Sequence, residues 1–123
     1  MELQRIRAEV AQAKGQFAHV EAYADGGGLL VRAAFHTSRG NTYVAELNLA
    51  DYPSRMPNVY IRAPQLGISP HKYKGGNICY LHPNMWNPGR HNLTFVLGRV
   101  AKWLNKYDVY CETGRWVGAA LEH

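Results

Sequence analysis

Residues 75–88 read GGNICYLHPNMWNP, a stretch that combines two glycines with cysteine, histidine, asparagine and tryptophan. Glycine carries no side chain, so backbone N–H groups there can approach a reacting atom closely. The thiol of Cys79 is a strong nucleophile, and a few per cent of such a thiol is thiolate at neutral pH. Hydrogen bonds or a proton for the group that the sulfur attacks could come from His71, His82 or Asn84. The stretch is therefore a candidate active-site loop built around Cys79.

The sequence that follows this loop predicts a helix. Apolar side chains recur every three or four positions over residues 93–105, with Asn92 or Thr94 as a suitable N-cap. Residues 63–89, which contain the loop, show no convincing periodicity, and an irregular segment this long in a compact domain is usually functional. The pattern over residues 107–123 is weaker and predicts a loop with a short helix.

The N-terminal half predicts one helix and then a sheet. Residues 1–14 place apolar side chains at helical spacing, and Gly15 ends this helix. Alternating residues separated by short turns then predict strands that form an antiparallel meander. A short fourth strand follows two prolines, which cannot donate to a sheet ladder and therefore belong in a loop or at an edge. The fold class is thus α+β, with strands expected at residues 16–23, 29–35, 42–49 and 59–61.

The composition favours a folded domain over disorder, because the 123 residues are 46% hydrophobic and 19% charged. This length suits one packed core, so residues 1–123 are expected to form a single domain. No apolar run approaches the roughly 18 residues of a membrane span, and the N-terminus lacks the apolar core of a secretory signal. Cys79 and Cys111 are then expected to be free thiols in a reducing compartment. The sequence therefore predicts a cytoplasmic protein.

The formal net charge is +5, but lysines and arginines are scattered and nowhere form a run of three. A basic surface of this kind can bind nucleic acid, suit an acidic or phosphate-bearing partner, or simply keep the protein soluble. Clustered charge would be the mark of a nucleic-acid site, so no specific binding to nucleic acid is expected.

Several motifs, in this order, resemble those of the ubiquitin-conjugating enzymes and their UBC-like fold. Residues 52–61, YPSRMPNVYI, are similar to the family's Tyr-Pro motif, second proline and fourth strand. Residues 76–81, GNICYL, are similar to its segment around the active-site cysteine, and residues 86–88, WNP, match its Trp-x-Pro one residue closer to that cysteine. The next helix opens with Leu-Thr, as in the family. Four motifs in the right order are far more specific than any one, and the resemblance spans residues 1–105.

Some features depart from the family's pattern. The family has His-Pro-Asn shortly before the cysteine, and that asparagine steadies the oxyanion, whereas residues 69–71 here read SPH. A literal His-Pro-Asn, residues 82–84, follows the cysteine, so the oxyanion role stays open between His71 and this second triplet. The C-terminal helix pair of eukaryotic members is missing or replaced, and residues 112–118 look like those of bacterial members. Those members belong to anti-phage defence operons, notably cyclic-oligonucleotide (CBASS) systems.

The resemblance implies acyl transfer through a thioester on Cys79. The donor would be the C-terminal glycine of a cyclic-nucleotide synthase or a ubiquitin-like protein, and the acceptor would be a lysine of a target protein. Backbone N–H groups around Gly76 and Asn77 would serve the oxyanion, while Tyr80 and Trp86 would form an apolar wall beside the attacking amine. No metal or organic cofactor is needed for this step. An activating enzyme would dock on residues 1–14, and residues 121–123, which match the start of a cloned affinity tag, carry little weight.

Other functions remain open on the sequence alone. The same fold could hold a partner without chemistry, although inactive family variants lack the cysteine and this chain keeps it. A cysteine hydrolase that removes a conjugate would need a base paired to Cys79, either His71 or His82, and a thiol pKa well below 7. His82, His91 and Cys111 offer donors that could bind zinc with Cys79, but they lack a second compact pair, so no metal site is expected.

Overall fold

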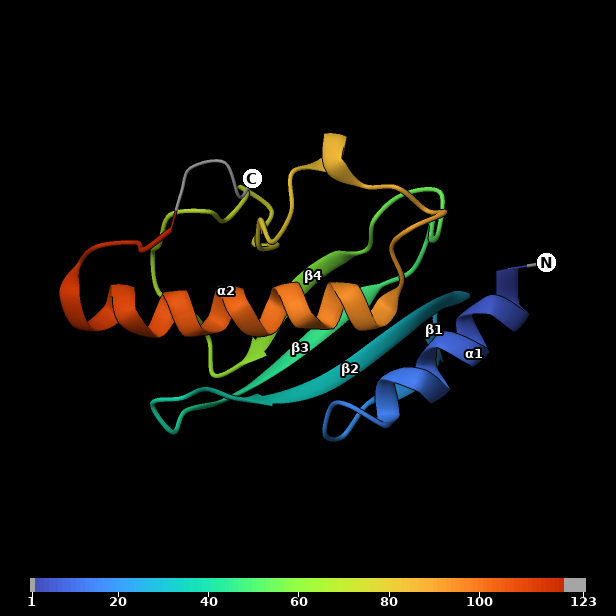
Figure 1. The fold of residues 1–123 in the computed structure, drawn as a ribbon, viewed down its shortest axis with the longest axis horizontal. Coiled ribbons are helices and arrows are strands. Elements are labelled where there is room, and N and C mark those ends of the chain that lie inside the picture. The colour runs from blue at the N-terminus through green and yellow to red at the C-terminus, as the bar shows by residue number, and fades with distance from the viewer. Residues whose placement is uncertain (1, 119–123) are drawn as a thin grey trace.

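The computed structural model describes residues 2–118 (Figure 1). A helix precedes a four-stranded sheet, and a long helix follows an extended irregular segment that contains one short 3-10 helix. The predicted α+β architecture is confirmed. The elements are α1 (Glu2–Lys14), β1 (Glu21–Asp25), β2 (Gly28–His36), β3 (Thr42–Asn48), β4 (Asn58–Ala63), η1 (Pro83–Met85) and α2 (Leu93–Thr113).

The sheet is a meander of order β1-β2-β3-β4 in which every neighbouring pair is antiparallel. Because side chains alternate along a strand, β3 buries Tyr43, Ala45 and Leu47 on one face. α2 runs across the sheet, and its buried side chains join those of β3 in one core (Figure 1). The Ile78 N–H donates to Val59 O on β4 at 2.9 Å, so the cysteine-bearing segment follows the β4 edge of the sheet.

The first predicted strand, residues 16–23, is wrong in its start, because β1 begins only at Glu21. The chain after α1 turns back before it reaches the sheet. The Gln16 and Phe17 N–H groups donate to Ala13 O at 3.0 and 2.9 Å, which continues the last turn of the helix. Ala18 O still accepts the Ala34 N–H of β2 at 3.3 Å, but regular pairing with β2 begins only at Glu21. The other three strands agree with the prediction to within two residues.

The loop predicted from residue 107 is also wrong, because α2 continues to Thr113. Tyr107 and Asp108 are buried against the sheet, so tertiary packing extends the helix beyond its clear apolar periodicity. The helix ends at Gly114, whose φ of +75° is the left-handed conformation that favours glycine. Across residues 2–118, no helix combines the length and the apolar character that a membrane crossing requires. The predicted tail beyond residue 118 lies outside the described residues.

A buried carboxylate, that of Glu9, joins α1 to the start of α2. It accepts hydrogen bonds from Tyr52 Oη–H and from the Leu93 N–H, the latter at 2.9 Å. Arg5 pairs with Glu9 and also donates to His91 O at 2.9 Å. A negative charge is favourable at the N-terminus of a helix, so this cluster fixes the two helices against each other. Arg5 therefore takes part in the contact between the two helices.

Candidate active site

A tight turn precedes the cysteine. Lys72 and Ile78 form an isolated antiparallel bridge, and the Tyr73 N–H donates to Asn77 O at 2.9 Å. The Gly76 N–H closes the turn by donating to Tyr73 O at 2.9 Å, and Gly76 has a φ of +93° that favours glycine. The glycine pair thus serves a turn that carries the tyrosine back toward the cysteine.

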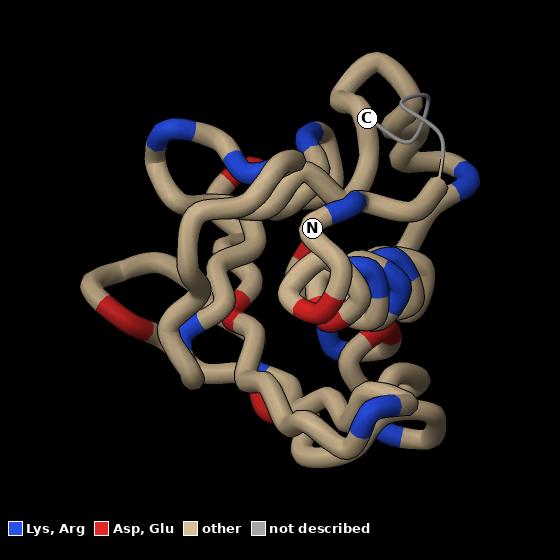
Figure 2. The backbone as a smooth tube through the Cα atoms, turned by 90° about the vertical axis from the view of Figure 1, so that its left-hand side faces the viewer, with Lys and Arg blue, Asp and Glu red and all other residues tan. Residues whose placement is uncertain are grey.

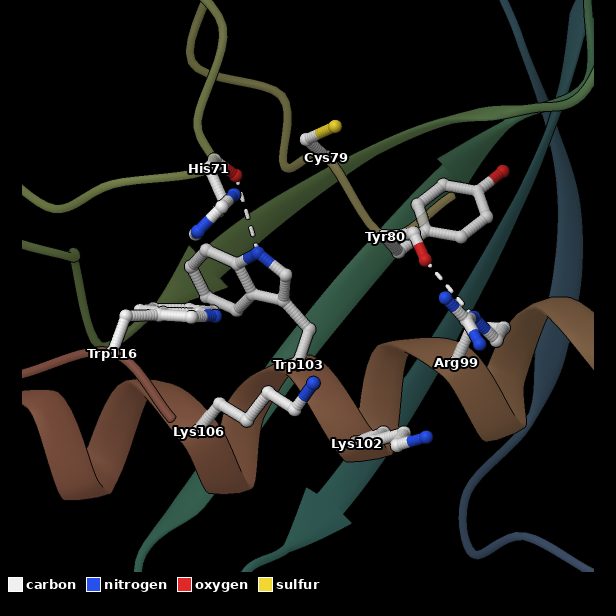
Figure 3. Close-up of a pocket in the computed structure, with 8 residues that line it drawn as sticks. All are labelled: His71, Cys79, Tyr80, Arg99, Lys102, Trp103, Lys106 and Trp116. Carbon is white, nitrogen blue, oxygen red and sulfur yellow. Dashed lines mark hydrogen bonds between the residues drawn. The ribbon is translucent and has the colours of Figure 1, made fainter. Parts of the chain in front are cut away.

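The backbone of His71 anchors the cysteine to α2. His71 O accepts two hydrogen bonds. One comes from the Cys79 N–H at 2.8 Å. The other comes from Trp103 Nε1–H at 3.1 Å and is drawn in Figure 3. His71 has a φ of +60°, which is uncommon for a residue with a side chain, and its ring packs on Trp116 with centroids 4.8 Å apart. The long helix therefore sets the position of the Cys79 backbone through Trp103 and His71.

Cys79 is largely enclosed, with an exposed fraction of 6%. Its Sγ–H donates to Tyr73 Oη at 3.2 Å, and in Figure 3 the sulfur points away from α2. Burial raises the pKa of the Cys79 thiol above its ordinary value, and the hydrogen bond with Tyr73 opposes this increase. The same hydrogen bond, together with burial, raises the pKa of Tyr73 to about 12. The phenol therefore stays protonated at neutral pH and can donate to a thiolate.

The thiol borders an open cleft of about 420 Å³. Both histidines named from the sequence line it, so the fold brings them together with the cysteine. His82 Nδ1 accepts the Asn84 N–H at 3.1 Å, which in the neutral imidazole places the ring proton on Nε2. The lining consists of His71, Lys72, Tyr73, Cys79 and His82.

Asn84 and Trp86 lie outside this cleft. Both line a neighbouring hollow of about 580 Å³. Trp86 Nε1–H donates to Pro53 O at 2.8 Å, and the indole ring packs on the rings of Tyr52 and His91. Trp86 therefore braces the Tyr-Pro loop and is not part of the lining around the thiol. The structure likewise does not bring the Asn84 side chain to the cleft that Cys79 borders.

Gly76, Asn77 and Tyr80 are committed to the fold around the cysteine. Tyr80 is buried, and its Oη–H donates to Pro57 O at 2.7 Å, so its ring packs in the core. Asn77 Nδ2 lies 3.4 Å from Asn58 Oδ1 on β4. The resemblance implied that backbone N–H groups around Gly76 and Asn77 stabilise the oxyanion. An N–H that already donates to a carbonyl cannot do so unless that hydrogen bond opens, so part of this expectation is corrected. The N–H groups that donate to backbone carbonyls, at 2.8–2.9 Å, are those of Gly76, Ile78 and Cys79.

Tyr73 is a site residue that the sequence reasoning missed. It precedes the cysteine by six positions, and only the turn brings its hydroxyl to the thiol. The Gly-Gly pair indicates a turn, but this turn pairs Tyr73 with Asn77, so the sequence does not show that the Tyr73 hydroxyl reaches Cys79. Trp103 also serves the site, because its Nε1–H donates to the His71 carbonyl that positions Cys79.

The two cysteines line different hollows, and both are free thiols. Cys111 is exposed and lines a hollow with Tyr43 and Asp108, whereas Cys79 lies in the loop beside His82. The zinc set considered from the sequence is therefore not assembled. Throughout residues 2–118, no group of three or more His, Cys, Asp or Glu side chains is arranged so that it could hold a metal ion.

The chain has the arrangement of the UBC-like fold of E2 proteins. Its N-terminal helix precedes a four-stranded meander, and a loop that carries a cysteine leads into a long helix. Residues 9–123 match a family model described as Type II CBASS E2 protein. The chain therefore belongs to the Type II CBASS E2 family, the UBC-like E2 proteins of CBASS anti-phage systems. No curated protein and no solved structure shows a significant match.

Proposed function

We propose that Cys79 carries the C-terminal glycine of a partner protein as a thioester and passes it to an amine. The natural donor would be a cyclic-nucleotide synthase of the same CBASS operon, with a ubiquitin-like protein as the second candidate. The observation that carries this proposal is the thiol at the border of an open cleft, with the Tyr73 hydroxyl 3.2 Å from Sγ. Membership of the E2 family supports a conjugating role in anti-phage defence.

The reaction would proceed in two steps. In the first step, the Cys79 thiolate attacks the activated carbonyl of the donor glycine, a carbon–sulfur bond forms, and the activating group leaves. In the second step, a lysine amine attacks the thioester, an amide forms, the amine loses a proton, and the thiolate is released. Each step passes through a tetrahedral oxyanion, and one positioned donor there is worth about 3 kcal/mol, or roughly a hundredfold in rate.

Three side chains of the cleft are the candidates to stabilise this oxyanion. Tyr73 offers a phenol that stays protonated at neutral pH, because its pKa is raised to about 12. His82 offers Nε2–H, since its Nδ1 is occupied by the Asn84 N–H. His71 lines the same cleft, but its ring packs on Trp116 with centroids 4.8 Å apart. We assign the nearest donor, Tyr73, to the sulfur and His82 to the oxyanion.

The binding face for an activating partner would be α1, as the resemblance to ubiquitin-conjugating enzymes implies. Arg7 and Lys14 are exposed on this helix, whereas Arg5 is held by Glu9 and by His91 O. The accessible positive charge of α1 is therefore smaller than its sequence suggests, and a charge-reversal test of this docking face should use Arg7 and Lys14.

A cysteine hydrolase is supported less well by the same site. Hydrolases activate the thiol with a paired base, which lowers the pKa of the cysteine. Here burial raises the pKa of Cys79, and the polar group hydrogen-bonded to Sγ is a tyrosine rather than a histidine. These two observations favour a carrier that accepts an already activated acyl group.

The test is to express the chain beside its operon neighbours and to compare wild type with Cys79→Ser by intact mass and non-reducing gels. We expect a thiol-labile adduct on wild type and a stable ester on the serine variant, with the donor identified by its mass. Cys111→Ser is the matched control and should behave as wild type, because Cys111 lies outside the cleft. If partners co-purify but no adduct forms with any neighbour, the protein is a binding module instead.

A further inference from the structure

The tail that follows α2, residues 114–118, turns back over the helix. The turn is made at Gly114, whose φ of +75° is left-handed and whose N–H donates to Tyr110 O at 2.8 Å. The tail consequently places Trp116 against α2 and beside His71 (Figure 3). The other residues of the tail are exposed, whereas Trp116 is partly buried and packs against the core. Trp116 therefore anchors the tail to the domain.

Ring packing, rather than charge, makes this anchor. Arg115 is the only charged residue of the tail, and its exposed side chain forms no ion pair with any described residue. Figure 2, where α2 is seen nearly end-on, shows Lys and Arg positions on this helix as well. The centroid of the Trp116 indole lies 4.8 Å from that of His71, 5.1 Å from that of Trp103 and 6.1 Å from that of Tyr110. These distances lie within the range of about 4.5–7 Å that is usual for packed aromatic rings.

The contact with His71 connects the tail to the active site. His71 has a φ of +60°, and a residue with a side chain keeps this conformation only where its surroundings hold it. Two tryptophans do so, because Trp103 Nε1–H donates to the His71 carbonyl at 3.1 Å and Trp116 packs on the His71 ring. The same carbonyl accepts the Cys79 N–H at 2.8 Å. Holding His71 in place therefore also holds the backbone of the nucleophile.

The enclosure of the thiol depends on this backbone position. Cys79 is 6% exposed, and its Sγ lies 3.2 Å from Tyr73 Oη. The backbone hydrogen bond between His71 and Cys79 lies at the base of the turn that carries Tyr73. If His71 moved, Cys79 would move relative to the tyrosine and to the core, and the sulfur would become more accessible to water.

We propose that Trp116 is a positioning residue of the active site, which packs on His71, keeps Cys79 enclosed and so protects the thioester from water. The inference rests on the proposed function and gives the tail a part in it. Trp116 does not line the open cleft that Cys79 borders, so it acts through His71 and not on the substrate. A tryptophan that only filled space would stabilise the protein without a specific effect on Cys79.

The first measurement needs no acyl donor. The rate of iodoacetamide alkylation of Cys79 is followed against pH in the full-length protein and read by peptide mass. We expect alkylation near pH 7 to be roughly fivefold faster in Trp116→Ala, since one aromatic pair contributes about 1 kcal/mol. The pH profile should move to lower pH, because burial raises the pKa of Cys79 and loss of enclosure reduces this effect.

The second measurement is the lifetime of the thioester. A short peptide that ends in a glycine thioester of a small thiol acylates Cys79, as its thiolate forms a carbon–sulfur bond and the small thiolate leaves. After removal of excess peptide, water attacks the acyl carbon, a carbon–oxygen bond forms, and the peptide acid and the Cys79 thiolate are released. Intact mass follows this loss, with Cys79→Ser to assign the site. The lifetime should be roughly fivefold shorter in Trp116→Ala.

Three variants separate positioning from general stability. Val31→Ala removes buried volume from β2 and lowers the stability of the whole protein, but should leave both measurements as in wild type. Val117→Ala changes the next residue of the tail, which is 48% exposed, and should also behave as wild type. Trp116→Phe keeps an aromatic ring and should recover most of the wild-type lifetime. Circular dichroism checks folding, and Trp116→Leu replaces the alanine variant if the latter does not fold.

The outcomes distinguish the inference from the proposed function. If the peptide does not acylate Cys79 in wild type, the thioester function fails, and the alkylation profile still decides the role of Trp116. If wild type is acylated but Trp116→Ala matches it in both measurements, the function stands and the inference is overturned. An equal effect of Val31→Ala would also overturn it, because loss of stability alone would then explain the result. A phenylalanine variant as reactive as the alanine variant would contradict a role through ring packing.

Discussion

Replacing Tyr73 by Phe should slow every reaction of the Cys79 thiolate. The variant keeps the ring of Tyr73 and removes the hydroxyl that lies 3.2 Å from Sγ. Burial raises the pKa of Cys79 and the hydroxyl opposes this increase, so without it the pKa rises further and less thiolate is present near neutral pH. A hydrogen bond to a charged group contributes about 1.5–3 kcal/mol. Because Tyr73 is 41% exposed, we use the lower end, about 1.5 kcal/mol, which corresponds to a roughly tenfold slower alkylation.

The assay is the rate of iodoacetamide alkylation between pH 6.5 and 10, read for each cysteine by peptide mass. The wild-type curve should rise at a higher pH than that of a thiol in an unfolded peptide, and the Phe variant should move it higher still. Cys111 is the internal control, because it is an exposed thiol that does not line the cleft that Cys79 borders. An unchanged or faster reaction of Cys79 in the Phe variant, with Cys111 unaltered, would refute the role given to the hydroxyl.

Two further substitutions test the fold that holds the site. Glu9→Ala removes the acceptor of Tyr52 Oη–H and of the Leu93 N–H. It should lower the free energy of unfolding, measured in urea, by about 3 kcal/mol. A loss under about 1 kcal/mol would contradict this. Burial alone would raise the pKa of Glu46, but hydrogen bonds from a tyrosine and two arginines lower it to about 2. Glu46→Gln should therefore cost about 2 kcal/mol at pH 7, discounted because the arginines are half exposed. This difference in thermal stability should shrink as pH falls from about 4.5 toward 2, and a constant difference would refute it.

Much of the fold follows from local patterns in the sequence. The β2, β3 and α1 boundaries are predictable because apolar spacing, glycine turns and Gly15 all indicate the same ends. The end of α2 is not, because packing of Tyr107 and Asp108, rather than an obvious apolar stripe, extends the helix toward Thr113. Local sequence patterns predict the ends of an element where local interactions set them. Tertiary contacts set the other ends.

The candidate site is predictable to a different extent. Cys79, His71 and His82 come together as the motifs suggest, because one irregular segment carries all three. The Tyr73 hydroxyl and the contact of α2 with the cysteine segment could not be placed in advance. The tyrosine reaches the thiol through a turn with a positive φ at Gly76, and α2 reaches it through Trp103, which lies far along the chain. The sequence identifies the nucleophile, but the groups that surround the nucleophile depend on how distant segments pack.

The raised pKa of Cys79 suits an acyl carrier and does not conflict with a role in acyl transfer. A thiol of higher pKa is a poorer leaving group, so its thioester reacts more slowly with a chance nucleophile. Burial also limits the access of water to the sulfur, whose residue is 6% exposed. Such a thioester would react mainly with an amine that the cleft positions beside an oxyanion donor. A hydrolase gains nothing from these properties, because its acyl-enzyme must react quickly with water. The burial that slows the free thiol would thus protect the acyl group until a target lysine arrives.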